Sequence, residues 1–368
     1  MRSVFVTALT LVSALALALV YGLGGFYALR GQLDAGAVVA MALLLTRLYS
    51  PLTALASARV DVMSALVSFE RVFEILDLAP LITEKPDART VPQGPVSVEF
   101  KNVTFAYPSA DKVSLASLEE VAILDTRGGE DVLHDLSFRT EAGQMVALVG
   151  TSGAGKSTVA QMIPRLYDID SGSVELGGVD VRDLSTDSIR ETVGMVTQDG
   201  HLFHESLRSN LLLARPDATE EDLREVLERA RLTDLVASLP DGLETVVGER
   251  GYRLSGGERQ RLTIARLLLA QPRVVILDEA TAHLDSTSEA AVQEALGEAL
   301  AGRTAVVIAH RLSTIRSADL ILVVEAGQIV ERGNHEELLA RGGRYAELYR
   351  TQFDTNARKN GALAPTPI

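Results

Sequence analysis

The stretch Gly150-Thr151-Ser152-Gly153-Ala154-Gly155-Lys156-Ser157 carries the clearest information about the fold of this 368-residue chain. It matches the pattern G-x-x-x-x-G-K-[ST] in full. A short apolar run, Gln144 to Val149, precedes it and has the length of a buried parallel strand. A strand followed by such a loop and then by a helix predicts an α/β fold with a mainly parallel sheet.

The residues of this loop are suited to hold phosphates. The glycines let backbone N–H groups turn inward around an anion, and the following helix points its positive end at the same place. Lys156 is predicted to reach the β- and γ-phosphates of a nucleotide, and the Ser157 hydroxyl is predicted to bind Mg²⁺. The nucleotide-binding residues expected in this stretch are Gly150, Thr151, Ser152, Gly153, Ala154, Gly155, Lys156, Ser157 and Thr158.

A second buried-strand pattern, Val274 to Leu277, ends in the acidic pair Asp278-Glu279. Asp278 is predicted to hold the metal, usually through water, and Glu279 to act as the catalytic base beside the attacking water. Phosphoryl transfer needs little covalent chemistry from the protein, so positioning and charge neutralisation carry most of its rate. The alternative for this pair is a solvated sheet edge.

Residues 254–261, Leu254-Ser255-Gly256-Gly257-Glu258-Arg259-Gln260-Arg261, resemble the signature sequence of ABC transporters. Ser255 and the two glycines open a helix N-terminus, which makes a second anion cradle. Two cradles far apart in one chain predict that two copies meet head to tail, with ATP between the phosphate loop of one copy and the signature of the other. The residues expected to contact ATP in this way are Leu254, Ser255, Gly256, Gly257 and Glu258.

The resemblance covers about residues 1–350 and is strongest to the exporter branch, the half-transporters of the multidrug and lipid-exporter kind. It implies a P-loop NTPase domain with a helical subdomain at roughly 200–265. It also implies that Tyr107 stacks on adenine. The alternative is that the Tyr107 ring only packs against other residues of the protein. Gln198 resembles the residue that contacts ATP and Mg²⁺ and joins them to the membrane domain, and His310 resembles the switch histidine that contacts the γ-phosphate, a catalytic role.

The first eighty residues predict an all-α transmembrane hairpin. Ser3 to Leu29 has no charged residue, and about 20 apolar residues in a helix cross the hydrocarbon core. A second apolar stretch runs from Ala35 to about Ala58 and contains Arg47. We expect both ends of the hairpin to face the cytoplasm, like the last two membrane helices of an exporter. The alternatives are a secretory signal for the first stretch and a buried soluble helix for the second.

Prolines after the hairpin indicate the domain division. We expect a partial transmembrane domain at 1–80, a linker at 81–96, an ABC ATP-binding domain at 97–352 and a disordered tail at 353–368. Compared with the family, the chain is expected to lack four membrane helices and their intracellular loops. It has an extra segment at roughly 111–131, and His283 stands where the family usually has a small residue. The loop 245–251 resembles the one with which exporters sense their membrane helices.

Composition narrows the chemistry and the partners. The formal net charge is −14, with no basic stripe, so nucleic acid is not an expected partner. The chain has no cysteine, which excludes disulfides and thiol nucleophiles. The sequence therefore predicts an ATP-hydrolysing exporter subunit in the cell membrane that pairs with a second ABC nucleotide-binding domain. A chain that supplies the missing helices is a further expected partner. The alternatives are a truncated remnant that binds ATP without transport, and a non-transport ABC ATPase.

Overall fold

The computed structural model describes residues 2–109, 129–197, 200–248, 252, 254–278, 286–309 and 311–351. The chain forms two compact units, an N-terminal one that ends at Ala79 and a second one that begins at Pro80.

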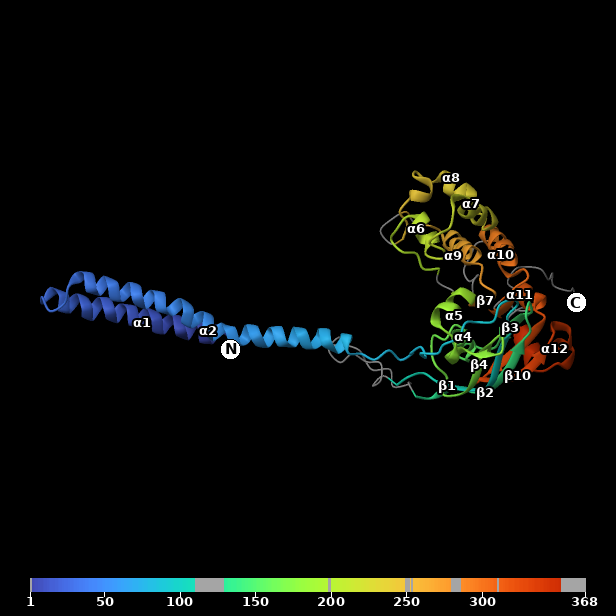
Figure 1. Ribbon diagram of the computed structural model, residues 1–368, viewed down its shortest axis with the longest axis horizontal. Helices are drawn as coiled ribbons and strands as arrows, with labels where there is room; N and C mark the ends of the chain where they lie inside the picture. The colour runs from blue at the N-terminus through green and yellow to red at the C-terminus, as the bar shows by residue number, and fades with distance from the viewer. Residues whose placement is uncertain are drawn as a thin grey trace, which may run out of the picture. The chain divides into compact units, whose positions relative to one another are not determined.

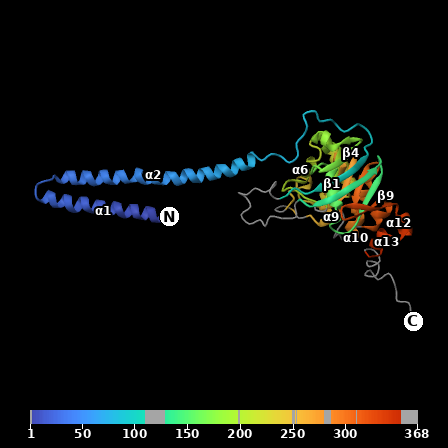
Figure 2. The same cartoon turned by 90° about the horizontal axis from the view of Figure 1, so that it is seen from below.

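The N-terminal unit is a helical hairpin of α1 (Arg2–Leu29) and α2 (Ala35–Leu76). The two helices lie side by side in both views (Figures 1 and 2). The Asp34 carboxylate accepts a hydrogen bond from the Gly36 N–H at 2.9 Å and caps the start of α2. A Cβ atom added at Gly24 would lie 2.9 Å from Val38 Cγ1, so the two helices pack closely at this level. The predicted helices are therefore present, and α2 continues well beyond the apolar stretch.

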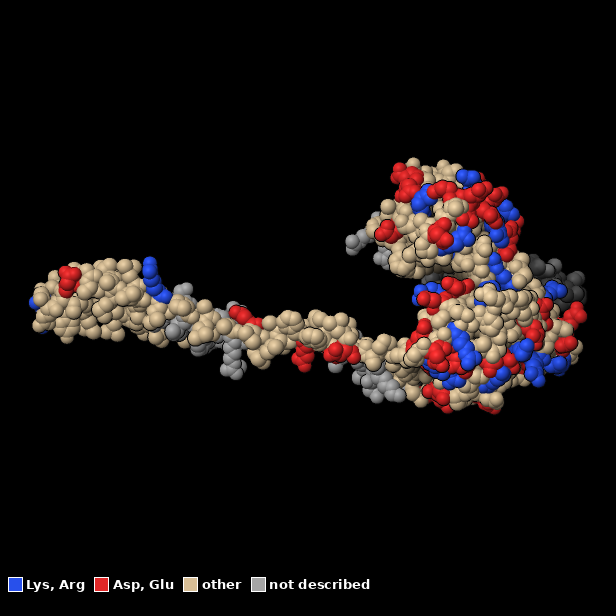
Figure 3. Space-filling view, viewed as in Figure 1, with Lys and Arg blue, Asp and Glu red and all other residues tan. Residues whose placement is uncertain are grey.

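Most large apolar side chains of the hairpin are exposed, and few charged side chains appear on the face shown in Figure 3. Among the described residues, one helical stretch, Thr10–Leu29, is long and apolar enough to cross a membrane. The apolar part of α2, Ala35–Leu48, is shorter than a full span. The length and hydropathy of the helices thus support the first predicted membrane span more directly than the second.

The second unit contains two sheets. The four-stranded sheet has the antiparallel order β2-β1-β4-β5, and the six-stranded sheet has the order β10-β9-β3-β8-β7-β6. In the larger sheet β9, β3, β8, β7 and β6 are parallel, and β10 is antiparallel at one edge. The strands are β1 (Val98–Ala106), β2 (Asp131–Thr140), β3 (Met145–Val149), β4 (Ser171–Leu176), β5 (Val179–Asp180), β6 (Val193–Val196), β7 (Val274–Asp278), β8 (Thr304–Ile308), β9 (Leu320–Glu325) and β10 (Gln328–Gly333).

Helices surround these sheets, and α6 to α9 gather into a group of their own (Figure 1). This group corresponds to the predicted helical subdomain and extends to Ala270. The helices of this unit are α4 (Lys156–Met162), α5 (Thr186–Thr192), α6 (Leu207–Leu212), α7 (Glu220–Arg229), α8 (Thr233–Ser238), α9 (Gly256–Ala270), α10 (Ser286–Leu300), α11 (Leu312–Ser317), α12 (His335–Arg341) and α13 (Arg344–Tyr349), with short 3₁₀ turns at Val181–Asp183 and Gly242–Glu244.

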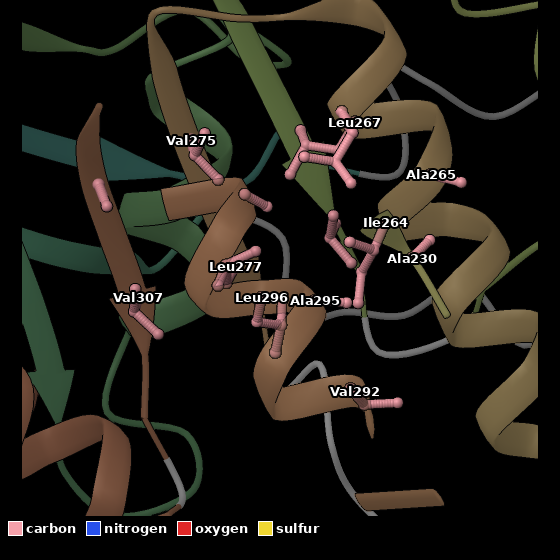
Figure 4. Close-up of a cluster of buried hydrophobic side chains, with 14 of the residues drawn as sticks. Ala230, Ile264, Ala265, Leu267, Val275, Leu277, Val292, Ala295, Leu296 and Val307 are labelled. Carbon is pink, nitrogen blue, oxygen red and sulfur yellow. The ribbon is translucent and has the colours of Figure 1, made fainter. Parts of the chain in front are cut away.

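The parallel strands are buried on both faces, as their continuous apolar sequences predict. Along β7, Val275 and Leu277 point to one apolar cluster, whereas Val274 and Ile276 point to another. The first cluster joins the sheet to α9 and α10, where Ile264, Leu267, Val292 and Leu296 pack with Val275, Leu277 and Val307 (Figure 4). The second cluster joins it to the four-stranded sheet. The central strands are thus clamped from both sides, which fixes where their carboxyl ends lie.

Candidate functional site

The functional residues follow neighbouring strand ends of the six-stranded sheet. Leu148 of β3 is paired with Ile308 of β8, and Ile308 is in turn paired with Asp278 of β7. Leu277 of β7 is paired with Val196 of β6. Because these strands are parallel and adjacent strands lie about 4.8 Å apart, the segments that follow them begin at one edge of the sheet. The phosphate loop, Asp278 and the segments after β6 and β8 therefore leave the same edge.

The phosphate loop requires glycine at particular positions. Gly153 and Gly155 have φ of 78° and 100°, in the left-handed region that favours glycine. A Cβ atom at Gly150 would lie 2.2 Å from the carbonyl oxygen of Val324. Gly150 therefore permits the close approach of the loop to β9, and the two later glycines permit its turn.

Lys156 places a buried cation inside the loop. Its side chain is at the first residue of α4, and the residue is 6% exposed. The ammonium donates hydrogen bonds to the carbonyl oxygens of Gly150 at 3.1 Å and of Thr151 at 2.8 Å. Thr151, Ser152, Gly153 and Ser157 are exposed, whereas Ala154, Gly155 and Thr158 are buried. A buried ammonium beneath an exposed glycine-rich loop forms a site that attracts phosphate.

The residues present suit Mg²⁺ bound together with a nucleotide. Ser157 offers a hydroxyl oxygen at the start of α4, and Asp278 offers carboxylate oxygens at the end of β7. Mg²⁺ is usually bound by one or two carboxylates with substrate phosphates and water, rather than by a protein cage. Within the described part of the chain, no group of three His, Cys, Asp or Glu side chains could hold a metal ion.

Tyr107 lies directly after β1 and beside α4. Its hydroxyl is 3.0 Å from the Thr158 hydroxyl and donates to Gln161 Oε1 at 3.2 Å. Its ring packs edge-to-face on Phe105 and Tyr167, with centroid distances of 5.1 and 5.2 Å. The ring is half-buried and stands next to the phosphate loop. Stacking on adenine stays a prediction for this residue.

The signature residues open the longest helix of the helical subdomain. Ser255 caps α9, where its hydroxyl accepts from the Glu258 N–H at 3.3 Å and the Glu258 carboxylate accepts from the Ser255 N–H at 2.6 Å. Leu254 and Gly257 are buried, whereas Ser255 and Gly256 are exposed. The start of α9 is thus capped and has an exposed serine and glycine, and its contact with ATP stays a prediction.

The segment after Gln198 is held by two residues that the sequence patterns did not reveal, Asn210 and Arg266. The fully buried Asn210 amide exchanges hydrogen bonds with both the N–H and the C=O of Phe203, each at 3.0 Å. Arg266 donates to the carbonyl oxygens of His201 at 2.8 Å and of Asn210 at 2.7 Å. Burial lowers the pKa of the Arg266 guanidinium. The sequence carries no local signal for this group, because Asn210 stands after Arg208 and Ser209 in a short helix of mixed polarity.

The loop 245–251 is described as far as Gly248. The Thr245 carbonyl accepts from the Leu207 N–H at 3.1 Å, and the Val247 N–H donates to the Glu205 carbonyl at 2.9 Å. The loop is therefore fixed against the start of α6, beside the segment that Asn210 holds.

Several predicted features lie outside the described residues. They are Gln198, Glu279 and His310, the stretch 280–285 with His283, residues 249–251, most of the extra segment 111–131, and the tail from 353. The Arg311 guanidinium, which directly follows His310, forms an ion pair with Glu289.

The chain is similar to known proteins over most of its length. A family model described as "ABC transporter" matches residues 133–282. The chain is 41% identical over 341 residues to a putative multidrug export ATP-binding/permease protein, YgaD, of Bacillus subtilis, which covers 93% of this chain and 56% of that protein. It is 39% identical over 330 residues to an ATP-dependent lipid A-core flippase of Syntrophus aciditrophicus, which covers 90% of this chain and 52% of that protein.

The chain is also similar to a solved structure over most of its length. A bacterial Atm1-family ABC exporter with ATP bound superposes with a TM-score of 0.73 at 34% identity, which covers 94% of this chain and 58% of that one. The chain spans about half the length of the curated relatives it matches. The predicted fold class and family resemblance are thereby confirmed. The chain carries an ABC transporter ATPase domain behind N-terminal helices and is similar to ABC exporters over most of its length.

Proposed function

We propose that this chain is the ATP-binding and ATP-hydrolysing part of an ABC exporter. The observation that carries the proposal is the common sheet edge from which the phosphate loop and Asp278 emerge, with Leu148, Ile308 and Asp278 in one register row. The likeness to an ABC exporter with ATP bound supports the same assignment.

The residues of the site have different roles in phosphoryl transfer. The loop 150–158 holds the phosphates, and Lys156 neutralises their charge. Ser157, Gln198 and Asp278 hold Mg²⁺, which supplies charge stabilisation to the reacting phosphate. Glu279 orients the attacking water and accepts its proton, and His310 contacts the γ-phosphate. Tyr107 stacks on adenine.

The second cradle requires a second nucleotide-binding domain. We assign the exposed start of α9, with Leu254, Ser255, Gly256, Gly257 and Glu258, to the ATP held by the partner domain. This partner is either a second copy of the chain or a related chain. The head-to-tail pair closes on ATP, and hydrolysis reopens it.

The hairpin gives this ATPase a membrane attachment. Thr10–Leu29 spans the membrane, and α2 supplies a second, shorter apolar crossing that continues as a cytoplasmic stalk. We propose a multi-pass protein of the cell membrane, with residues 1–80 in the transmembrane part, 81–96 as the linker, 97–352 as the cytoplasmic ATPase domain and 353–368 as a tail.

ATP binding and turnover by the purified chain in lipid nanodiscs test the proposal. Lys156→Ala removes the buried ammonium and is expected to abolish turnover and weaken ATP binding at least tenfold. Lys101→Ala is the matched control, because Lys101 is exposed and paired with Glu175 on the four-stranded sheet. Parental activity in both variants would refute the assignment of the phosphate site.

A mild-detergent purification of the tagged chain from its native membrane tests the partner. We expect a stable pair of ATPase domains, formed either by two copies of this chain or by this chain and a related one, and identified by intact mass. Recovery of the monomer alone would contradict the proposed assembly.

A further inference from the structure

Residues 83–97, here called the strap, belong to the second unit and form hydrogen bonds with other residues of that unit. Arg165, which is 8% exposed, donates to the Thr83 carbonyl oxygen at 3.2 Å and pairs with Asp168. The Glu84 carboxylate accepts from the Thr186 N–H at 2.7 Å. The Arg89 N–H donates to the Asp183 carbonyl at 2.8 Å. The strap is thus part of the ATPase unit from its first residues.

The next part of the strap is fastened directly before three parallel strands. The Val91 N–H donates to the Ser188 hydroxyl at 2.7 Å, within α5, the helix that leads into β6. Arg273 directly precedes β7, and its Nη1 donates to the carbonyl oxygens of Pro92 at 2.5 Å and of Gly94 at 3.0 Å. Pro92 and Pro95 have no N–H groups, so this part of the strap cannot pair fully as a sheet strand. The Arg273 side chain satisfies the Pro92 and Gly94 carbonyls instead.

Two further contacts complete these attachments. Arg273 Nη2 donates to the Thr192 hydroxyl at 2.8 Å, at the last residue of α5. Thr304, the first residue of β8, is 1% exposed. Its hydroxyl donates to the Val96 carbonyl at 2.6 Å and accepts from the Gly143 N–H at 2.9 Å. One guanidinium and one buried hydroxyl therefore bind the strap to the starts of β6, β7 and β8.

The same three strands carry the functional residues at their other ends. β7 ends in Asp278, β6 leads to residues 197–198, and β8 leads to residues 309–310. A strand rises about 3.3 Å per residue, so the attachments lie only about 13–17 Å from the carboxyl edge. Both clusters of apolar side chains clamp these strands, and a close-packed interior transmits displacement rather than absorbing it.

We infer that Arg273 is a positioning residue for ATP hydrolysis: it fixes the strap to the starts of β6 and β7 and thereby sets the alignment of Asp278 with its neighbours. The inference rests on the proposed ATPase function.

The absence of cysteine from the chain allows a clean test of the first half of this inference. A single cysteine introduced at the exposed Gln93 carries a nitroxide spin label, and its spectrum reports motion of the strap in the full chain in nanodiscs. We expect an immobilised spectrum in the parent and a mobile component in Arg273→Ala. An unchanged spectrum in Arg273→Ala would overturn the assignment of Arg273 as the anchor.

Steady-state kinetics on the same proteins test the second half. Arg273→Ala is expected to lower kcat for ATP about fivefold and to leave KM within twofold, whereas Arg273→Lys, which keeps the charge but not the two-pronged geometry, should restore an intermediate kcat. Arg341→Ala is the matched control, because Arg341 also donates to a backbone carbonyl, that of Arg332, away from the strap. A parental kcat in Arg273→Ala with a mobile spin label would show that the strap does not position the site.

Thr304→Val keeps the experiment interpretable if Arg273→Ala fails to fold. Valine has nearly the shape of threonine but cannot donate to the Val96 carbonyl, so we expect the same selective fall in kcat. A fall in melting temperature with no change in kcat would mean a purely structural contact and would overturn the inference. Failure of the proposed function would look different, since the parent itself would then hydrolyse no ATP while its spin label stayed immobilised.

Discussion

Asp278, the last residue of β7, is paired in register with Ile308, the last residue of β8. The carboxyl ends of β7 and β8 therefore lie at adjacent points on one sheet edge. β3 lies on the other side of β8 and delivers the phosphate loop to the same edge. The register of three short strands thus brings together segments that lie far apart in sequence.

Tyr107 is predicted to contact the base of the nucleotide rather than its phosphates. Tyr107→Ala should weaken ATP binding by about 1–3 kcal/mol, which is the usual value of one aromatic stacked on a base. Binding of inorganic tripolyphosphate should not change. Tyr107→Phe keeps the ring, loses only the hydroxyl contacts with Thr158 and Gln161, and should bind ATP like the parent.

Isothermal titration of both ligands against the three proteins measures this difference. Equal weakening of ATP and tripolyphosphate in Tyr107→Ala would indicate that the ring only packs against α4.

Ser255→Arg is predicted to stop turnover without preventing a single domain from binding nucleotide. The substitution fills the exposed cradle at the start of α9 with a bulky side chain. Thr219→Arg is the matched control, because Thr219 caps α7 with the same kind of capping box. Each change removes a helix cap worth about 1 kcal/mol, so stability should fall similarly in both.

Turnover and nucleotide-dependent dimerisation should be lost only in Ser255→Arg, as measured by ATPase assay and light scattering with ATP. Loss of turnover in both variants to the same degree would point to destabilised helices instead of a cradle.

Gly150→Ala is predicted to distort the phosphate loop. The new methyl group would meet the Val324 carbonyl oxygen at 2.2 Å, and such overpacking costs about 1–3 kcal/mol of folding free energy. Gly297→Ala makes the same chemical change in the exposed face of α10, where nothing lies within 4 Å, and should stabilise the protein by about 0.5–1 kcal/mol. Thermal unfolding of the two variants should therefore shift in opposite directions, and a parental melting temperature in Gly150→Ala would show that the loop accepts a side chain there.

The strand, loop and helix around Lys156 could be predicted from the sequence because local rules determine them. Glycines stand where φ is positive or where backbones meet, and apolar runs of five residues read as buried strands. The start of α9 was equally visible, since Ser255 and Glu258 form a local capping box.

Contacts between distant segments could not be predicted in this way. The prolines of residues 83–97 indicated a linker, whereas the side chains that hold this segment come from Arg273 and Thr304, 181 and 208 residues away from their acceptors at Pro92 and Val96. Asn210 and Arg266 likewise belong to no local motif, because their partners are assembled only when α6 packs on α9. Such long-range polar contacts leave no periodicity in the sequence.

ATP turnover by Glu279→Gln is the most direct test of the account. Glutamine keeps the size of the side chain but cannot accept the proton of the attacking water, a role that usually contributes about 10²–10⁴-fold in rate. Glu294→Gln is the control, because it changes an exposed carboxylate on α10 that is paired with Arg231. We predict that Glu279→Gln binds ATP like the parent and loses at least a hundredfold in kcat, while Glu294→Gln keeps parental turnover. Equal turnover in Glu279→Gln and the parent would contradict the assignment of this sheet edge as the site of ATP hydrolysis.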